Sequence, residues 1–403
     1  MTPQATPSEG RGGARAWAEL LRLPALFTVP GDALAGAAAT GRRPNHRTLL
    51  AIGSSLCLYE AGMALNDWAD RADDAVERPH RPLPSGRIAP AAALTAAGGL
   101  TLAGLALAAR AGRPALTVAS SLAATVWAYD LGLKHTPMGP ATMATARTLD
   151  LLLGATATTG VARGERSGAS NGGRPVSGRP ARGGPVSGRP MRGGPVSGRP
   201  MRGLPVRGRR MRGLPVPQPL PTAPALGTPR HGGPPSRPRP TVAAAAISPG
   251  KATGRVRDAL PSAVALGVHT LVVTTVSRRE AQGGSSAAPL AALAVTAVLG
   301  QLLTHGRPRR HSIRGAGQPP RTPRDTARSL LGAAYAATAA RPLAHAALNP
   351  SPQLTQRAVG GGIRAMIPLQ AALAARSGAL GTALATAALA PLAGKLARKV
   401  SVT

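Results

Sequence analysis

Apolar stretches long enough to approach the thickness of a lipid bilayer recur along the chain, separated by short polar segments. A membrane-spanning helix needs about 20 mostly apolar residues, because each residue adds about 1.5 Å along the helix axis. The windows that approach this length are Leu23–Thr40, Leu49–Leu65, Ala89–Ala109, Pro114–Trp127, Met138–Val161, Ala259–Val276, Ala287–Thr304, Thr326–Leu348 and Ser377–Leu396. Ala365–Ala375 is shorter, and we expect a re-entrant or interfacial piece there. The pattern predicts an all-α transmembrane bundle with about nine spans.

Charged residues inside these windows are few. Arg147 and Asp150 fall in one window and Arg341 in another. A charged group is costly in lipid, so such residues usually face the interior of the bundle or a polar cavity. For Arg147 two interpretations stay open: it lines a cavity, or it pairs with Asp150 one helical turn away.

The apolar surface of the chain comes from small and aliphatic side chains. Hydrophobic residues make up 43% of the sequence but aromatic residues only 2%, whereas a soluble core would normally use several large aromatic rings. Small residues let helix backbones approach closely, which is how helices associate in lipid. The one cysteine, Cys57, excludes an internal disulfide and a cysteine-rich metal site. Composition therefore favours a membrane bundle.

Residues 163–257 interrupt the apolar pattern with Arg, Gly and Pro. A ten-residue repeat runs from Val176 to Pro215, beginning VSGRPARGGP VSGRPMRGGP. Its few apolar residues cannot bury enough surface to offset the entropy of ordering, so we expect this insert to be disordered. We divide the chain into a polar N-terminal segment (1–22), a first membrane half (23–162), the insert (163–257) and a second half (258–403) with a basic loop at 306–325.

The formal net charge of +34 raises the possibility of a nucleic-acid partner. The Arg residues are concentrated in the insert and in the basic loop rather than in the apolar body. The insert has no Phe or Tyr to stack on bases, so any binding would be electrostatic and sensitive to salt. We therefore expect no nucleic-acid partner. The polar start of the chain also predicts no removable signal peptide.

The segment Asn66–Ile88, NDWADRADDAVERPHRPLPSGRI, carries the densest candidate chemistry. Asp67, Asp70 and Asp74 stand at positions i, i+3 and i+7, which share one face of a continuous helix. Three carboxylates on one face repel each other, and Mg²⁺ is a cation that such oxygens commonly share with substrate phosphates. The alternative is a solvated acidic helix end followed by a basic loop. The acidic cluster directly follows an apolar span, which favours the metal interpretation.

The same segment, NDWADRADDAVERPHRPLPSG, resembles the first aspartate-rich motif of UbiA-type prenyltransferases, NDxxDxxxDxxxxRPxRPxxxG. The number and order of apolar windows are similar too. More narrowly, the chain resembles the EboC-like members of that superfamily. The stretches that carry this likeness are YDLGLKHTPMGPATMATARTLDLLLG, TTVSRREA, AVGGGIRAMIPLQAALAARSG and the ending LARKVSVT.

The resemblance implies a multi-pass protein of the cytoplasmic membrane that transfers a prenyl group from a polyprenyl diphosphate to an acceptor, often aromatic, with Mg²⁺. It implies that Asp67, Asp70 and Asp74 hold the metal ion and that Asn66 supports them. The residues that it places near the diphosphate are Arg78, Arg81, Tyr129, Lys134 and Arg147. For Lys134 a second interpretation stays open, a lysine that extends to the membrane interface.

The chain departs from the family where a second aspartate-rich motif should follow the sixth span. The sequence there is SRREAQGG, with Arg278 and Arg279 and no Asp. Either these arginines bind the diphosphate directly, or the protein no longer ionises a prenyl diphosphate. In the second case it would serve the transport or assembly of a secondary metabolite.

Overall fold

The computed structural model describes residues 7–22, 27–160, 255–278, 285–305 and 322–401, with side chains from residue 13 to residue 395. All of these belong to one compact unit formed by Met1–Gly168 and Pro249–Thr403. The predicted insert lies outside the described residues except for residues 255–257, and so does the basic loop except for residues 322–325. The predictions about both segments, and the domain boundaries drawn from them, stay predictions.

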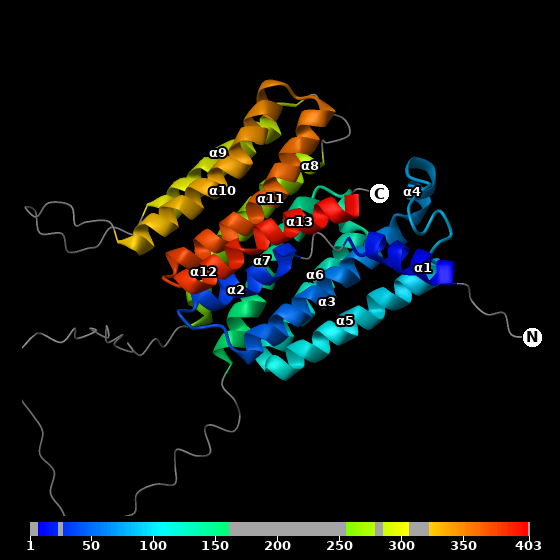
Figure 1. Ribbon diagram of the computed structural model, residues 1–403, viewed down its shortest axis with the longest axis horizontal. Helices are drawn as coiled ribbons and strands as arrows, with labels where there is room; N and C mark the ends of the chain where they lie inside the picture. The colour runs from blue at the N-terminus through cyan, green and yellow to red at the C-terminus, as the bar shows by residue number, and fades with distance from the viewer. Residues whose placement is uncertain (1–6, 23–26, 161–254, 279–284, 306–321, 402–403) are drawn as a thin grey trace, which may run out of the picture. The chain divides into compact units, whose positions relative to one another are not determined.

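The described ranges contain helices and turns but no strand, which confirms the all-α prediction. Figure 1 shows the helices in chain order. They are α1 (Pro7–Leu20), α2 (Val29–Ala39), α3 (His46–Ala69), α4 (Arg71–Glu77), α5 (Pro90–Ala111), α6 (Arg113–Leu131), η2 (Leu133–His135), α7 (Gly139–Thr159), η3 (Val256–Ala259), α8 (Leu260–Ser277), α9 (Ala287–Thr304), α10 (Pro323–Leu348), α11 (Pro352–Arg376), α12 (Leu380–Ala387) and α13 (Leu389–Ser401).

Five segments in the described ranges are long and apolar enough to cross a membrane: α3, α5, η3 with α8, α9 and α11. The predicted windows in α6, α7 and α10 are also helical, at 19, 21 and 26 residues, but fall outside that set. The window Leu23–Thr40 contains α2, which at 11 residues is too short to span. Small and polar residues lower the hydropathy of these windows relative to the five.

Two predictions about the C-terminal region are wrong. The expected span Ser377–Leu396 is divided between α12 and α13, which meet at Ala388. The expected short piece Ala365–Ala375 is instead the second half of α11, a helix of 25 residues that continues through Pro368. A proline inside a buried helix is tolerated where neighbouring helices cover the freed backbone groups, and the alanine-rich second half of α11 is buried.

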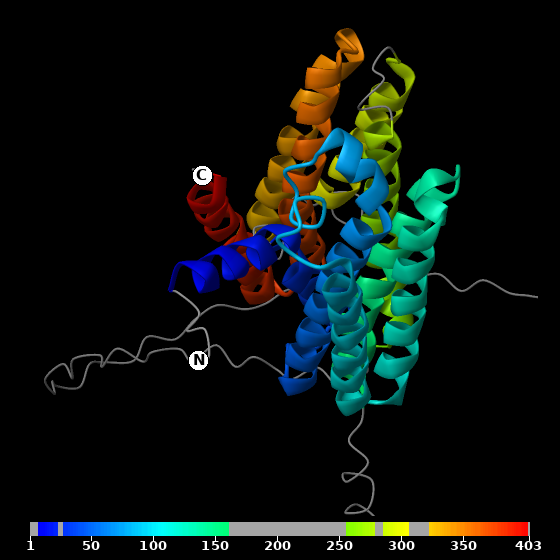
Figure 2. The ribbon, with the colours of Figure 1, turned by 90° about the vertical axis from the view of Figure 1, so that its right-hand side faces the viewer.

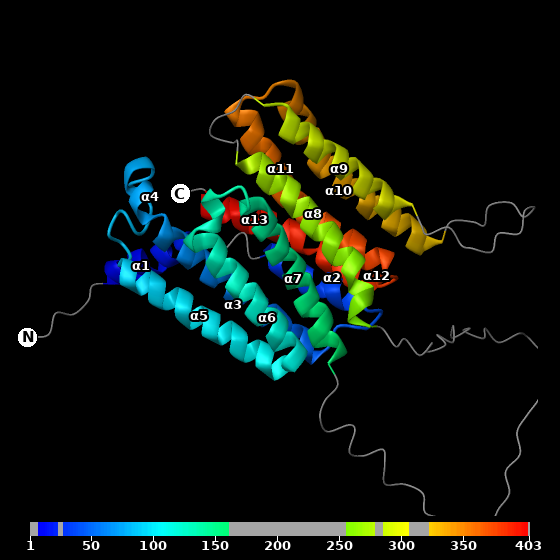
Figure 3. The ribbon, with the colours of Figure 1, turned by 180° about the vertical axis from the view of Figure 1, so that it is seen from behind.

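Close helix contacts in the first half depend on glycine. A Cβ added to Gly36 of α2 would lie 2.0 Å from the Leu151 carbonyl oxygen of α7, and one added to Gly154 of α7 would lie 2.4 Å from Ala33 Cα. The two helices therefore touch backbone to backbone, as small residues permit in membranes. Helix α3 packs against α5, α6 and α7, and these helices run side by side in Figure 3.

The second half packs α8, α9, α10 and α11 around a core of Ala and Leu with one buried ring pair. The Tyr335 hydroxyl lies 3.1 Å from His269 Nδ1, and His269 Nε2 lies 3.0 Å from the Gly362 carbonyl oxygen. These contacts join α10, α8 and α11 and satisfy polar groups that burial would otherwise penalise.

Figure 2 shows α4 and the loop that follows it beyond the end of α3, which is where the candidate site begins.

Candidate active site

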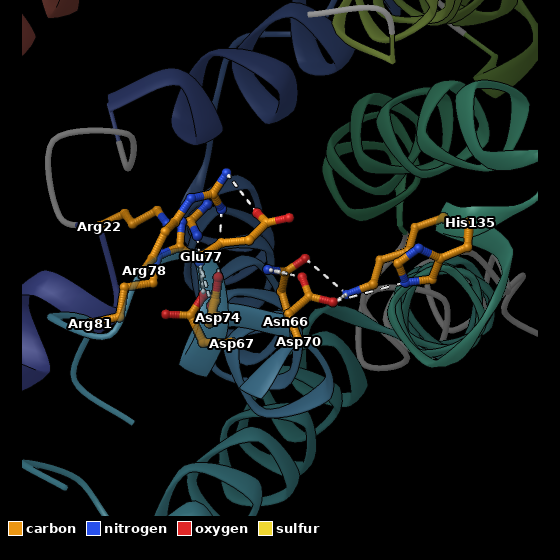
Figure 4. Close-up of polar contacts among 10 residues, drawn as sticks. Arg22, Asn66, Asp67, Asp70, Asp74, Glu77, Arg78, Arg81 and His135 are labelled. Atoms are coloured by element: carbon orange, nitrogen blue, oxygen red, sulfur yellow. Dashed lines mark hydrogen bonds and ion pairs between the residues drawn. The ribbon is translucent and has the colours of Figure 1, made fainter. Parts of the chain in front are cut away.

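The helix that carries the aspartates is interrupted at Asp70. Helix α3 ends at Ala69, Asp70 has φ −85° and ψ 5°, and the short helix α4 starts at Arg71. The expected continuous helical face for Asp67, Asp70 and Asp74 is therefore wrong. The break redirects α4, so that the three carboxylates divide between two places (Figure 4).

Asp67 and Asp74 meet at one guanidinium. Arg81 Nη1 lies 2.6 Å from Asp74 Oδ2 and 3.8 Å from Asp67 Oδ1, and Arg78 Nη1 lies 3.5 Å from Asp74 Oδ1. Only 6% of the Asp67 side chain and 5% of the Asp74 side chain are exposed. Burying two carboxylates together is tolerable only with opposite charge beside them, and the two arginines of the motif supply it.

Arg22 joins this cluster from outside the motif. Its Nη2 donates to Asp67 Oδ1 at 3.0 Å. Arg22 follows α1 and has a φ of 48°, the one positive value among the described non-glycine residues. Such a conformation is unfavourable for a residue with a Cβ. Sequence reasoning missed Arg22, because it lies 45 residues before Asp67 and no local pattern marks it.

Asp70 faces a different partner set. Lys134 Nζ lies 2.5 Å from Asp70 Oδ1 and donates to Asn66 Oδ1 at 3.4 Å. Asn66 Nδ2 in turn donates to Asp70 Oδ2 at 3.2 Å. Only 8% of the Lys134 side chain is exposed. Lys134 therefore lies inside the polar cluster, and the alternative of a lysine extended to the membrane interface does not describe its position.

The loop after α4 is shaped by residues of the motif. Gly86 has a φ of 72°, a conformation that favours glycine and explains the last fixed position of the pattern. Arg87 donates to Glu19 Oε2 at 2.8 Å and to the His80 carbonyl oxygen at 2.6 Å. The hydrogen bond to Glu19 raises the pKa of the Arg87 guanidinium. Arg87 thus fastens the loop to α1 rather than facing the carboxylates.

A cavity of about 260 Å³ adjoins both parts of the cluster. Arg22 and Asn66, which contact Asp67 and Asp70, also line this cavity, and its walls come from α3, α6 and α7. Its apolar lining includes Leu58, Met63, Leu122, Val126 and Met143, together with the predicted site residue Tyr129. The aspartate cluster therefore opens onto a mainly apolar chamber inside the bundle.

The far part of the cavity lining is polar. Arg147 lines it and donates from Nη1 to Asp32 Oδ2 at 2.5 Å. Gln370 of α11 donates to Asp32 Oδ1 at 2.6 Å. Asp150 accepts a hydrogen bond from Ser55. Of the two interpretations of Arg147, cavity lining describes the structure, while its ion-pair partner is Asp32 rather than Asp150. Sequence reasoning named neither Asp32 nor Gln370.

Of the two arginines after the sixth predicted span, the structure describes only the first. Arg278 directly follows α8 and donates from Nη1 to the Thr136 carbonyl oxygen, two residues from Lys134. It also lies close to Gly139, where an added Cβ would come within 3.2 Å of Arg278 Nη1. Arg278 is thus at the cluster end of the bundle but is not among the residues that line the cavity. Arg279 lies outside the described residues.

The motif side chains are oxygen donors of the kind that bind a divalent cation. Asn66, Asp67, Asp70 and Asp74 offer oxygen atoms, which Mg²⁺ prefers. Within the described ranges, however, no three Asp, Glu, His or Cys side chains are grouped so that they could hold one ion. Asp67 and Asp74 converge on one point, now filled by Arg81, whereas Asp70 faces Lys134. The donor chemistry fits Mg²⁺ at Asp67 and Asp74, and Asp70 stands apart.

Comparison with known proteins finds a family that the aspartate region resembles. Residues 25–170 match the UbiA prenyltransferase family. The match covers α2 to α7, and so the aspartate cluster and the cavity-lining helices α3, α6 and α7. The all-helical UbiA-type fold is also seen in an apo structure of a UbiA homolog from Aeropyrum pernix K1, with a TM-score of 0.50, 16% identity and coverage of 86% of this chain and 96% of that chain.

Two curated proteins are similar in sequence to part of this chain. The digeranylgeranylglyceryl phosphate synthase of Methanopyrus kandleri is 35% identical over 129 residues, which are 31% of this chain and 46% of the relative. The protein of the same name from Methanothrix thermoacetophila is 38% identical over 93 residues, 23% of this chain and 35% of the relative. The matched regions thus span less than half the length of these relatives, and neither carries the EboC name.

Proposed function

We propose that this protein transfers a prenyl group from a prenyl diphosphate to an acceptor held in the cavity between α3, α6 and α7, within the cytoplasmic membrane. One observation carries the proposal: a cluster of carboxylates, of which Asp67 and Asp74 are buried, lies with its partner cations beside a mainly apolar chamber. Arg22 and Asn66 belong to both parts, since each contacts a motif aspartate and lines the chamber. The charged end suits a diphosphate and the apolar walls suit a prenyl chain.

The cations of the cluster would bind the diphosphate. Arg78, Arg81 and Lys134 each contact a motif carboxylate, and guanidinium groups match phosphate oxygens well. Negative charge grows on the leaving diphosphate as its bond to the prenyl carbon breaks. Donors already placed around that group stabilise this charge without reorganising. Arg278, beside Thr136, would extend the same cationic end where the family has its second aspartate-rich motif.

Mg²⁺ would be held by Asp67 and Asp74, the two carboxylates that converge, with Asn66 and Asp70 nearby. Bound there, the ion supplies positive charge to the departing diphosphate. The chain's own contribution is to hold the phosphate end with arginine and lysine and to surround the prenyl carbon with apolar side chains. Leu122, Val126 and Met143 line the chamber, and such walls keep water from an allylic cation.

The names of the relatives favour an acceptor of the glyceryl phosphate type over the aromatic acceptor that the family resemblance implies. Both relatives are named for a product with two geranylgeranyl groups on glyceryl phosphate. An acceptor hydroxyl could reach the prenyl carbon from the polar part of the cavity, where Arg147 and Asp150 lie. The narrower likeness to EboC-like proteins is kept as part of this proposal. It concerns the pathway in which the protein acts rather than the residues of the site.

A transfer assay tests the function. Purified protein in lipid nanodiscs is incubated with labelled geranylgeranyl diphosphate, Mg²⁺, and either geranylgeranylglyceryl phosphate or 4-hydroxybenzoate. We expect a doubly prenylated glyceryl phosphate from the wild type and none from Asp67→Asn. The matched control is Asp73→Asn, an exposed neighbour in α4, which should give product at the wild-type rate. A wild type that makes no prenylated product with any acceptor would favour the transport or assembly role.

A further inference from the structure

Asp130 is a buried acidic residue that lines the cavity and to which the proposed function assigns no role. It lies in the last turn of α6, and 5% of the residue is exposed. It lines the cavity next to Tyr129 and Asn66. No hydrogen bond or ion pair joins its carboxylate to any residue that the structure describes. A buried charged group without a partner is costly, so it calls for an explanation.

The neighbours of Asp130 are occupied elsewhere. Lys134, one helical turn further on, bonds to Asp70 and Asn66 instead. Asp130 lies close to α3, where a Cβ added to Gly62 would lie 3.8 Å from Asp130 Oδ2. The same Cβ would lie 3.0 Å from Val126 Cγ1, so α6 packs closely against α3 beside the carboxylate. Asp130 lines the same cavity as Asn66 of the charged cluster and Asp150 of the polar far part.

The other acidic residues of the region either have a hydrogen-bond or ion-pair partner or lie away from the cavity. Asp67, Asp70 and Asp74 each contact Arg or Lys, and Asp150 accepts a hydrogen bond from Ser55. Glu60 is buried with both carboxylate oxygens unpartnered, but it is not among the residues that line the cavity. Among the described cavity-lining acids, Asp130 is thus the one whose oxygens are free to accept a proton from a bound molecule.

We propose that Asp130 is the general base of the transfer, an inference that rests on the proposed function. The bond between the prenyl carbon and the diphosphate oxygen breaks, and the electron pair leaves with the diphosphate. The acceptor oxygen forms a new bond to that carbon with one of its lone pairs. The proton of the acceptor hydroxyl passes to the Asp130 carboxylate and later leaves to water. The step requires an acceptor that loses a proton, such as an alcohol, and no further reactant.

Removing the base should separate transfer from binding. We expect Asp130→Asn to bind geranylgeranyl diphosphate as tightly as the wild type. Its transfer to geranylgeranylglyceryl phosphate should fall by about 10²–10⁴-fold, the usual contribution of a general base. Because the diphosphate can still leave, Asp130→Asn should release a larger share of geranylgeraniol, formed by capture of water, per product than the wild type.

A conservative variant and a matched control complete the test. Asp130→Glu keeps a carboxylate and should transfer at least about tenfold faster than Asp130→Asn. Asp73→Asn should transfer at the wild-type rate. Full transfer activity in Asp130→Asn would overturn the proposal, and so would equal losses in the Asn and Glu variants. Lost diphosphate binding in Asp130→Asn would overturn it in favour of a diphosphate-binding role. A wild type that does not bind the diphosphate would refute the proposed function itself.

Discussion

Lys134 and Asp70 form a partly buried ion pair, with 2.5 Å between Nζ and Oδ1, that joins η2 to the end of α3. Asn66 completes the contact by donating to Asp70 and accepting from Lys134. The pair separates Asp70 from Asp67 and Asp74, which share Arg81. The aspartate-rich motif therefore contacts two separate sets of cations beside one cavity, arginines at Asp67 and Asp74 and Lys134 at Asp70, and each set can be tested separately.

Replacing Lys134 should weaken diphosphate binding. Lys134→Gln keeps a hydrogen-bond donor but removes the charge, and a charge-assisted hydrogen bond is worth about 1.5–3 kcal/mol. We expect the Kd for geranylgeranyl diphosphate to rise by about ten- to a hundredfold, measured by calorimetry in detergent. Arg110→Gln, an exposed cation in the last turn of α5, should bind as the wild type does. An unchanged Kd in Lys134→Gln would show that Lys134 only supports the fold.

The contact between Arg147 and Asp32 should hold α7 to α2. Asp32 is fully buried and also accepts from Gln370. Removing one partner of such a pair leaves an uncompensated buried charge, which typically costs about 3–5 kcal/mol. We expect Asp32→Ala to lower the unfolding free energy by that order, measured by denaturant titration in detergent micelles.

A double-mutant cycle supplies the control for that pair. Arg147→Met together with Asp32→Ala removes both charges, so the double variant should be more stable than the sum of the single losses predicts. Strictly additive losses would mean that Arg147 and Asp32 do not interact energetically.

The backbone contact between α2 and α7 should not tolerate a methyl group. A Cβ on Gly154 would lie 2.4 Å from Ala33 Cα, whereas Gly99 of α5 has nothing within 4 Å. We expect Gly154→Ala to destabilise the protein by about 1–3 kcal/mol, as overpacking does. Gly99→Ala should stabilise it by up to about 1 kcal/mol through lower backbone entropy. Thermal unfolding of both variants in the same detergent checks this, and equal shifts in Tm would contradict the close packing.

We expect Arg22 to lower the stability of the protein and to strengthen diphosphate binding. Its φ of 48° is unfavourable for any residue but glycine, while its guanidinium contacts Asp67. We expect Arg22→Gly to unfold at a higher temperature than Arg22→Ala, because glycine relieves the backbone. Both variants should lose affinity for geranylgeranyl diphosphate to the same extent. A gain in affinity in either variant would show that Arg22 obstructs the site.

Part of this site was predictable from the sequence and part was not. The motif named Asn66, Asp67, Asp74, Arg78 and Arg81, because a short segment with fixed spacing brings them together whatever the remaining chain does. The spacing could not reveal the break at Asp70, since i, i+3 and i+7 are equally compatible with one helix or with two.

Residues that come from distant segments left no signal. Arg22, Asp32 and Gln370 reach the site or the polar far part of the cavity only through tertiary packing, and none lies in a local pattern of acids or bases. The prediction of helices from apolar windows was limited in a similar way. Ala and Gly are nearly neutral in lipid, so the sequence could not distinguish the two helices after Ser377 from one span, nor the long helix α11 from a short piece.

Binding of geranylgeranyl diphosphate to the purified protein, with Mg²⁺ and then with excess EDTA, tests the central claim most directly. We expect saturable binding with Mg²⁺, a large loss of affinity in EDTA, and a comparable loss with Mg²⁺ present in Asp67→Asn and Asp74→Asn but not in Asp73→Asn. Binding that is the same with and without Mg²⁺, and in all three variants, would contradict a diphosphate site at this cluster.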